Sequence, residues 1–363
     1  MGSVFKDSDS AGKALYYGLS NPIVSWLSAD EEDPVLLQRA KMYITSGGGI
    51  AVALKILQKT GQILDETRNN AAERIAAIFG KPVNELDAVA STSGPGLIVC
   101  LSVGLSFSKA FASSLNKPFI AVNHLEGHAL SPKLNSKLDY PYLLLLISGG
   151  HSQYLCVKNL SEYKRLGTTI DDAIGEAFDK TAKILGIEFP GGPQIEIFAK
   201  KGNPNKYNLP KPIYNKGGCN MSFAGLKTAI LKIAKEIKTD QEKFDLAASF
   251  QKTVIEILYK KTKNAFTEFE KQIKTKEKKF VVAGGVAANK KIRHMLNNLC
   301  KEKNYKAIFP PIELCGDNAA MIAMVGLEKF KKKEFSELSH PATPRWPLDK
   351  EAIFLKGAGV KLD

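Results

Sequence analysis

The sequence changes from an apolar run to a polar, histidine-containing stretch at Phe119-Ile120-Ala121-Val122-Asn123-His124-Leu125-Glu126-Gly127-His128. The first four residues have the composition of a buried strand, and the rest predicts a helix that begins near His124. In a helix, His124 and His128 are spaced i, i+4, so both imidazoles lie on one face, one turn apart. Such a pair is a common half-site for a transition metal, but polar surface at a strand–helix junction explains it equally well. A third ligand is needed to decide.

The candidate for that third ligand is Asp317, which lies between Gly316 and Asn318 at the start of a predicted helix. Its alternative role is to cap that helix. His151, beside a glycine turn, is a competing ligand. His294 and His340 lie in Lys-rich and Pro-rich surroundings and are predicted to be surface residues.

A zinc protease is an alternative use of the histidine pair. Its signature is His-Glu-x-x-His, in which the Glu follows the first His and reaches the metal-bound water. Here Glu126 comes two residues after His124, about 200° round the helix from it. Glu126 is therefore expected to point away from a metal, which argues against a protease.

Three glycine-rich turns follow predicted strands, at 93–96, 148–150 and 284–285. Glycine allows backbone N–H groups to converge on an anion, and the N-terminus of a following helix adds its dipole. Each turn alone is weak support, but together they favour a nucleotide site. Nearby, Asp179 could accept hydrogen bonds from ribose hydroxyls or lie on a solvated helix face. Asn289 could contact a ligand or cap a helix.

Composition limits the class of protein. The chain has 363 residues, 44% hydrophobic and 24% charged, which suits a globular protein of two lobes. We expect no membrane span, no signal peptide and a cytoplasmic location, where the five scattered cysteines stay reduced. The net charge of +14, with lysine clusters at 271–279 and 329–333, would attract a polyanion such as RNA, unless the lysines are simply solvated surface.

Two further patterns give local expectations. Thr169, followed by Asp172 three residues later, predicts the N-terminal cap of a helix. The Pro-rich stretch 341–347 is expected to be a surface tail.

A series of ordered motifs extends from about residue 70 to about residue 350. They are Ser93–Leu97, Asn123–His128, Leu146–His151, Ile170–Lys180, Pro190–Pro193, Ser222–Thr228, Ala283–Asn289 and Asp317–Met321. In this order they resemble the universal tRNA threonylcarbamoyladenosine transferase family, in its bacterial-type form.

The resemblance implies the α/β two-lobed fold of actin, hexokinase and the Hsp70 ATPase domain. The first lobe would comprise residues 1–138 and 315–363, and the second residues 139–314. It implies one divalent metal ion per subunit, Fe²⁺ in preference to Zn²⁺, held by His124, His128 and Asp317. It also implies that an adenine nucleotide contacts a second set of residues, which are Leu146, Ile147, Ser148, Gly149, Gly150, Asp179, Gly192 and Asn289.

The implied activity is an acyltransferase reaction in tRNA processing. The threonylcarbamoyl group would pass from threonylcarbamoyl-AMP to N6 of adenosine 37 in tRNAs that read codons starting with A, which is t6A modification. Family members work with an inactive paralogue and a small ATPase.

One segment departs from the family pattern. Family members open with a strand and a phosphate-facing loop that carries a catalytically important acidic residue, and residues 1–69 contain no match to it. No catalytic residue is therefore assigned. The alternative function is a catalytically impaired homologue that binds metal and nucleotide and acts as a scaffold or partner.

Overall fold

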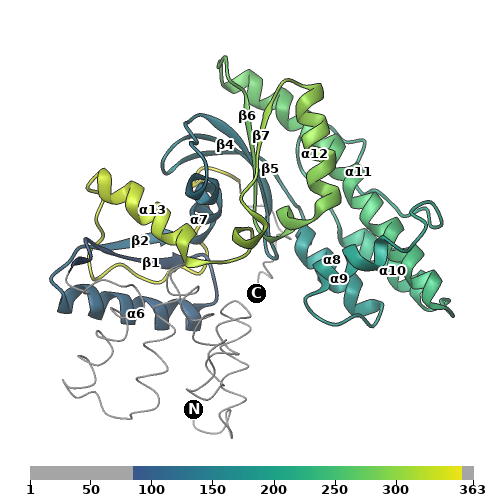
Figure 1. Cartoon of the computed structure of the whole chain (residues 1–363), viewed down its shortest axis with the longest axis horizontal. Coiled ribbons are helices and arrows are strands. Elements are labelled where there is room, and N and C mark those ends of the chain that lie inside the picture. Colours follow the sequence, from purple (N-terminus) through teal and green to yellow (C-terminus); the bar gives the residue numbers. More distant parts are fainter. Residues whose placement is uncertain (1–84, 354–363) are drawn as a thin grey trace, which may run out of the picture. The chain divides into compact units, whose positions relative to one another are not determined.

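The computed structural model describes residues 85–353 (Figure 1), and the expectations for residues 1–69 lie outside this range. The described part forms two compact units. Unit 1 contains residues 85–134 and 317–347, and unit 2 contains residues 135–316 and 348–353. Each unit is described by itself.

Unit 1 is a small parallel sheet between helices. Strand β1 (Val89–Gly94) pairs in parallel with β2 (Phe119–Asn123), and α6 (Ile98–Ser114) connects them. Figure 1 shows α6 on one face of this sheet and α13 (Ala319–Lys331) on the other. Every residue of β2 is buried, as expected of a strand covered on both faces. The predicted strand at 119–122 is therefore confirmed.

The C-terminal part of unit 1 runs along both strands. The backbone N–H of Ser336 donates to the Phe119 carbonyl, and that of Thr343 donates to the Ser93 carbonyl at 2.7 Å. The Asn123 side chain donates to the Trp346 carbonyl. Residues 341–347 lie at the surface, as expected, but they do not form a free tail, because backbone groups of Thr343 and Trp346 bond to residues at the ends of the strands.

Unit 2 is built on a five-stranded mixed sheet in the order β5-β4-β3-β6-β7. Strand β4 pairs antiparallel with both β3 and β5, whereas β3, β6 and β7 run parallel to one another. The strands are β3 (Tyr142–Ile147), β4 (Ser152–Asn159), β5 (Glu162–Thr168), β6 (Lys279–Ala283) and β7 (Lys306–Ile308). The glycine turn at 148–150 follows β3, as predicted, and joins it to β4 in a hairpin.

Helices cover this sheet and supply most of its core. Phe178 and Phe250 meet edge to face, with ring centroids 4.9 Å apart. Phe266 stacks on Tyr305 at 3.9 Å. The helices are α8 (Ile174–Ile184), α9 (Gly191–Ala199), α10 (Ala224–Ala234), α11 (Asp240–Gln272) and α12 (Lys290–Glu302), with short 3₁₀ turns η3 (Gly285–Ala288) and η4 (Ile312–Leu314). Within residues 85–353, none of the helices combines the length and the apolar character that a bilayer crossing requires.

Candidate metal centre and anion-binding turns

The histidine pair is placed by the junction between β2 and α7 (His124–Leu130). Asn123 ends the strand in an extended conformation, and its Oδ1 accepts a hydrogen bond from the N–H of Leu125 at 2.9 Å. This cap starts the helix at His124. His124 and His128 consequently lie one turn apart on one face, with ring centroids separated by 4.9 Å.

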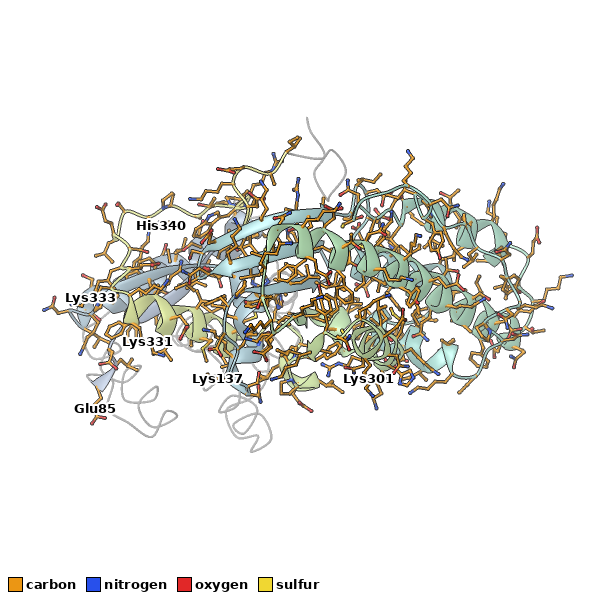
Figure 2. The ribbon with its side chains drawn as sticks, turned by 90° about the horizontal axis from the view of Figure 1, so that it is seen from above. Glu85, Lys137, Lys301, Lys331, Lys333 and His340 are labelled. Atoms are coloured by element: carbon orange, nitrogen blue, oxygen red, sulfur yellow. The ribbon has the colours of Figure 1, made fainter. Side chains whose placement is uncertain are left out.

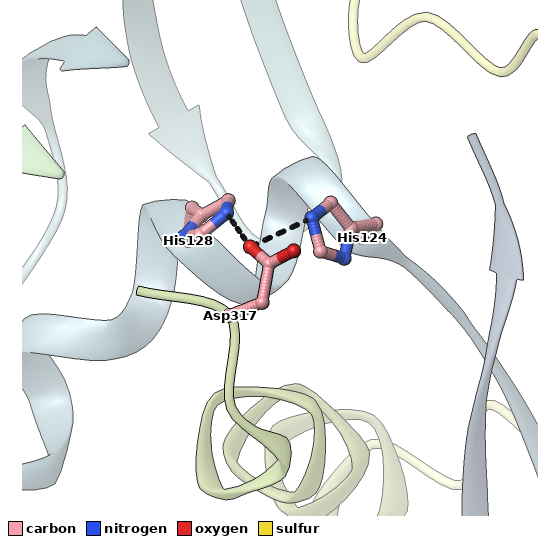
Figure 3. Close-up of side chains that lie close together, drawn as sticks. All are labelled: His124, His128 and Asp317. Carbon is pink, nitrogen blue, oxygen red and sulfur yellow. Dashed lines mark ion pairs between the residues drawn. The ribbon is translucent and has the colours of Figure 1, made fainter. Parts of the chain in front are cut away.

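Asp317 joins the two imidazoles (Figure 3). Its Oδ1 lies 3.3 Å from Nε2 of His124 and 3.0 Å from Nε2 of His128. The alternative role of Asp317 as a helix cap is wrong. Asn318 caps α13 instead, by accepting a hydrogen bond from the N–H of Met321 at 2.9 Å. The Asp317 side chain is therefore free to face the histidines.

The electrostatics of the three groups depend on one another. Burial lowers the pKa of His124, but the Asp317 carboxylate outweighs this effect and leaves that pKa raised. Burial and the neighbouring His124 both lower the pKa of His128. Asp317 acts to raise that pKa, but the net effect is a lowered value. Desolvation acts to raise the pKa of Asp317, but the two imidazoles hold it well below its usual range. The carboxylate is thus ionised at neutral pH, and His128 favours its neutral form.

The donor set fits a divalent metal ion. His124, His128 and Asp317 each offer one potential ligand atom, and these three atoms all lie within 4.8 Å of one another. Among the described residues, neither ring nitrogen of His128 has a hydrogen-bond partner, although both are buried. Nε2 of His128 and Oδ1 of Asp317 are 3.0 Å apart and form an ion-pair contact. A buried imidazole nitrogen with an uncommitted lone pair, beside a second imidazole and a carboxylate, is compatible with divalent metal binding.

Other predicted or alternative ligands lie elsewhere. Glu126 is buried and pairs with Lys329, with 3.4 Å between Oε2 and Nζ. His151 is absent from the cluster of potential ligands found among residues 85–353. His294 is exposed and lies 3.0 Å from the Asn298 amide. Glu126 therefore contacts a lysine on α13 and is absent from the cluster of potential ligands, so it gives no support to a protease.

The first glycine turn of unit 2 joins β3 to β4. Leu146 and Ile147 are buried in β3, and the next residue, Ser148, closes the turn. Its N–H donates to the His151 carbonyl at 2.8 Å, and its Oγ accepts from the His151 N–H at 3.2 Å. Gly149 and Gly150 are exposed, and a Cβ added to either would meet no atom within 4 Å. Their backbone is therefore open to a ligand.

Two other segments pack against this turn. Gly284 has φ +97°, and a Cβ there would lie 2.4 Å from the Ile147 carbonyl oxygen. At Gly175, in the first turn of α8, a Cβ would lie 2.6 Å from the Ser148 carbonyl oxygen. Only glycine permits these approaches. The two glycine turns and the N-terminus of α8 therefore meet within unit 2, which is an arrangement suited to an anion.

The remaining predicted nucleotide residues already have protein partners. Asp179 Oδ1 accepts from the N–H of Gly191 at 3.1 Å. Burial raises the pKa of Asp179, and the N–H groups of Gly191 and Gly192 lower it in part. Asn289 caps α12 by accepting from the N–H groups of Lys291 and Ile292, and its amide donates to Gln251. The cap is thus the observed role of Asn289.

Asp171 is a structural anchor that the sequence analysis missed. Its Oδ1 accepts from the N–H groups of Phe223 at 2.7 Å and Ala224 at 3.3 Å, and its Oδ2 accepts from the Ser222 hydroxyl. It thereby fixes the start of α10. The paired carboxylates at 171–172 were the available signal, but they were read as part of a helix.

The lysine cluster at 271–279 is largely neutralised by neighbouring carboxylates. Lys271 pairs with Glu268 and Lys278 with Glu270, each at 2.8 Å. At the other cluster, Lys331 and Lys333 are exposed near the end of α13 (Figure 2). The clustered charge therefore gives a weaker field than the sequence alone indicates.

Comparison with known proteins identifies the family. The model of the tRNA N6-adenosine threonylcarbamoyltransferase family matches residues 62–324. The protein of that name from Pelagibacter ubique (strain HTCC1062) is 77% identical over 283 residues, which cover 78% of this chain and 79% of the relative. Its namesake from Rickettsia massiliae (strain Mtu5) is 52% identical over 270 residues, which cover 74% and 78% respectively.

Solved structures confirm the fold class. Full-length HypF in a phosphate- and nucleotide-bound form matches with a TM-score of 0.53 and 14% identity, over 76% of this chain and 43% of that one. HypF of T. kodakarensis matches with a TM-score of 0.55 and 16% identity, over 77% and 45%. This chain thus spans less than half of either protein. The fold is the predicted α/β fold of actin, hexokinase and the Hsp70 ATPase domain.

The motif order in the sequence, the family match and the two close relatives agree. They cover both the histidine–aspartate cluster and the glycine turns. The chain belongs to the tRNA N6-adenosine threonylcarbamoyltransferase family.

Proposed function

We propose that the chain transfers the threonylcarbamoyl group from threonylcarbamoyl-AMP to N6 of adenosine 37 in tRNAs that read codons starting with A, forming t6A. The observation that carries the proposal is the cluster of His124, His128 and Asp317 inside the segment that matches the family. Relatives at 77% and 52% identity carry the transferase name. None of the comparisons favours the alternative of a catalytically impaired homologue, and residues 1–69, on which it rests, are outside the described range.

The histidine–aspartate cluster is proposed to hold one divalent ion, Fe²⁺ in preference to Zn²⁺. When bound, such an ion supplies Lewis-acid polarisation to a carbonyl or phosphate oxygen. His128 contributes a buried nitrogen whose pKa favours the neutral, coordinating form. Asp317 contributes a carboxylate that stays ionised at neutral pH. The set of two imidazoles and one carboxylate suits both metals.

The turns of unit 2 are proposed to hold the adenylate. Leu146 to Gly150, together with Gly192, would place backbone groups against its phosphate, and Asp179 and Asn289 would contact its nucleoside. In the reaction, the N6 amine attacks the carbamoyl carbon and loses a proton, while the bond from that carbon to the phosphate oxygen breaks. AMP leaves with the negative charge, which backbone N–H groups at a glycine turn and the N-terminus of α8 are suited to stabilise.

The proposal extends to partners and organisation. The tRNA provides the polyanion that a net charge of +14 would attract. An inactive paralogue and a small ATPase are proposed as protein partners, in the cytoplasm. Residues 1–138 and 315–363 are proposed as the first lobe and residues 139–314 as the second.

The test is a reconstituted transfer assay. Purified full chain, loaded with Fe²⁺ or Zn²⁺, is incubated with threonylcarbamoyl-AMP and an unmodified tRNA transcript, with and without the partner proteins, and t6A is measured by nucleoside mass spectrometry. We expect product from the wild type and a loss of about 100-fold or more in His128→Ala and Asp317→Ala. The exposed His294→Ala is the matched control and should retain activity. An absence of product from metal-loaded wild type in every combination contradicts the proposal.

A further inference from the structure

The two segments that carry the histidines and the aspartate are also joined by four charged side chains that do not belong to the cluster. Glu126 of α7 pairs with Lys329 of α13 at 3.4 Å, and Lys133, in the 3₁₀ turn η2 (Ser131–Leu134) after α7, pairs with Glu328 of α13. We call Glu126, Lys133, Glu328 and Lys329 the charge clamp. Lys329 also donates to the Ala121 carbonyl in β2 at 3.4 Å.

The clamp is enclosed. The Glu126 and Lys329 side chains are only 3% and 13% exposed, and those of Lys133 and Glu328 are 15% and 19% exposed. Ion pairs on an open surface contribute little, whereas loss of one member of an enclosed pair leaves an uncompensated charge. The clamp is therefore expected to contribute more to stability than the Lys331–Glu328 pair, in which Lys331 is 62% exposed.

The two segments touch at three levels along α13. Asp317 faces the histidines just before the helix begins. One turn further on, Gly127 packs so closely that an added Cβ would lie 2.9 Å from Ile322 and 3.2 Å from Met321. The clamp lies at the other end of the helix, about 15 Å from its start at a rise of 1.5 Å per residue. Contacts at three separated levels fix both the position and the rotation of one helix on the other.

The order of charges specifies one register. Glu328 and Lys329 are adjacent on α13, and they meet Lys133 and Glu126 respectively. A one-residue slip would move α13 by about 1.5 Å and turn it by about 100°, which breaks both pairs. A metal site tolerates deviations of only about 0.2 Å in its ligand distances. A shift of α13 by one residue is far larger than a metal site tolerates. By opposing that shift, the clamp helps to preserve the cluster.

We propose that the charge clamp positions Asp317 for metal binding by holding α13 in register against α7. Glu126 is thus a positioning residue within the motif Asn123–His128, acting through Lys329, and it does not touch the metal itself. The inference rests on the metal site proposed above.

The test measures Co²⁺ binding to the purified full chain, by titration and by the visible absorption of the bound ion. The variants are Glu126→Gln, Lys329→Met and the double variant E126Q/K329M, with Lys332→Met, an exposed lysine at the C-terminal cap of α13, as the matched control. Thermal unfolding of each metal-free protein is measured in parallel. We expect each single variant to bind Co²⁺ about tenfold more weakly, with a changed absorption spectrum, and to unfold at a lower temperature. The control should match the wild type.

The double variant separates positioning from simple stabilisation. Removing both members of this pair leaves neither of them opposite a lost partner, so part of the lost thermal stability should be recovered. Co²⁺ affinity should stay low, because nothing restores the register. Recovery of both properties together, or Co²⁺ affinities within about twofold of the wild type in the single variants, overturns the proposal. Failure of the wild type itself to bind Co²⁺ refutes the metal site, and the clamp's role falls with it.

Discussion

Gly284 passes so close to Ile147 that an added Cβ would lie 2.4 Å from the Ile147 carbonyl oxygen. This contact joins the end of β6 to the end of β3, beside the turn proposed to bind the adenylate. The glycine also has φ +97°, a conformation that side chains disfavour.

Gly284→Ala should therefore lower the free energy of unfolding by about 2–4 kcal/mol, from backbone strain and overpacking. Urea denaturation measures this loss, and AMP binding by calorimetry should weaken as well. Gly285→Ala is the control, because a Cβ there meets no atom within 4 Å. Equal stability of the two variants would contradict the packing argument.

Asp171→Asn should loosen the start of α10. The carboxylate accepts from two backbone N–H groups and the Ser222 hydroxyl, and an amide keeps only one acceptor oxygen. We expect a loss of about 1–3 kcal/mol in unfolding free energy and faster amide hydrogen exchange at Phe223 and Ala224. The control is Asp240→Asn. The Asp240 side chain pairs with Lys243 but is 79% exposed, so this change should lower the unfolding free energy by less than about 0.5 kcal/mol. Unchanged exchange at 223–224 would refute the anchor.

Metal removal should abolish transfer reversibly. After chelation and desalting, t6A formation should disappear and return when Fe²⁺ or Zn²⁺ is added. Because the ion binds the folded state, saturation at about 100 times its dissociation constant should raise the unfolding free energy by about 2.7 kcal/mol. Asp317→Ala should show neither rescue nor stabilisation. Full activity in the chelated wild type would exclude a metal requirement.

Protonation of Glu328 should account for part of the loss of stability at acid pH. Burial acts to raise the pKa of its carboxyl, but Lys133 and Lys331 outweigh that and leave the pKa below its usual value. Because the carboxyl has a lower pKa in the folded state, its ionised form stabilises the fold. This stabilisation is complete above the pKa of the unfolded state, about 4.3, and is lost as the pH falls through the folded-state pKa. Glu328→Gln should therefore be less stable than the wild type at neutral pH, and the difference should shrink below about pH 4. A difference independent of pH, measured by urea denaturation, would contradict this.

The elements that the sequence predicted well are those set by local pattern. The apolar run at 119–122 lies within the strand β2, and the Asn123 cap starts a helix that brings His124 and His128 together. Both depend only on neighbouring residues. Asp317 was identified as a candidate only from its loop and from family resemblance, because no local pattern reports a partner so distant in the chain.

The errors came from long-range contacts. Thr169 was expected to cap a helix, but Ala173 occupies the N-cap position of α8. Thr169 instead forms a β-bridge with Met221. In the same way, residues 341–347 were read as a tail because their bonds to Ser93 and Asn123 leave no periodic signature.

The division of unit 1 between residues 85–134 and 317–347 has a consequence for synthesis on the ribosome. His124 and His128 are translated before residues 135–316, and Asp317 only after them. A nascent chain therefore carries the two histidines through the whole synthesis of that stretch before their carboxylate partner exists. The third candidate ligand and the segment that bonds along β1 and β2 emerge close together, so the complete set of ligands becomes available only after residues 135–316 have been translated.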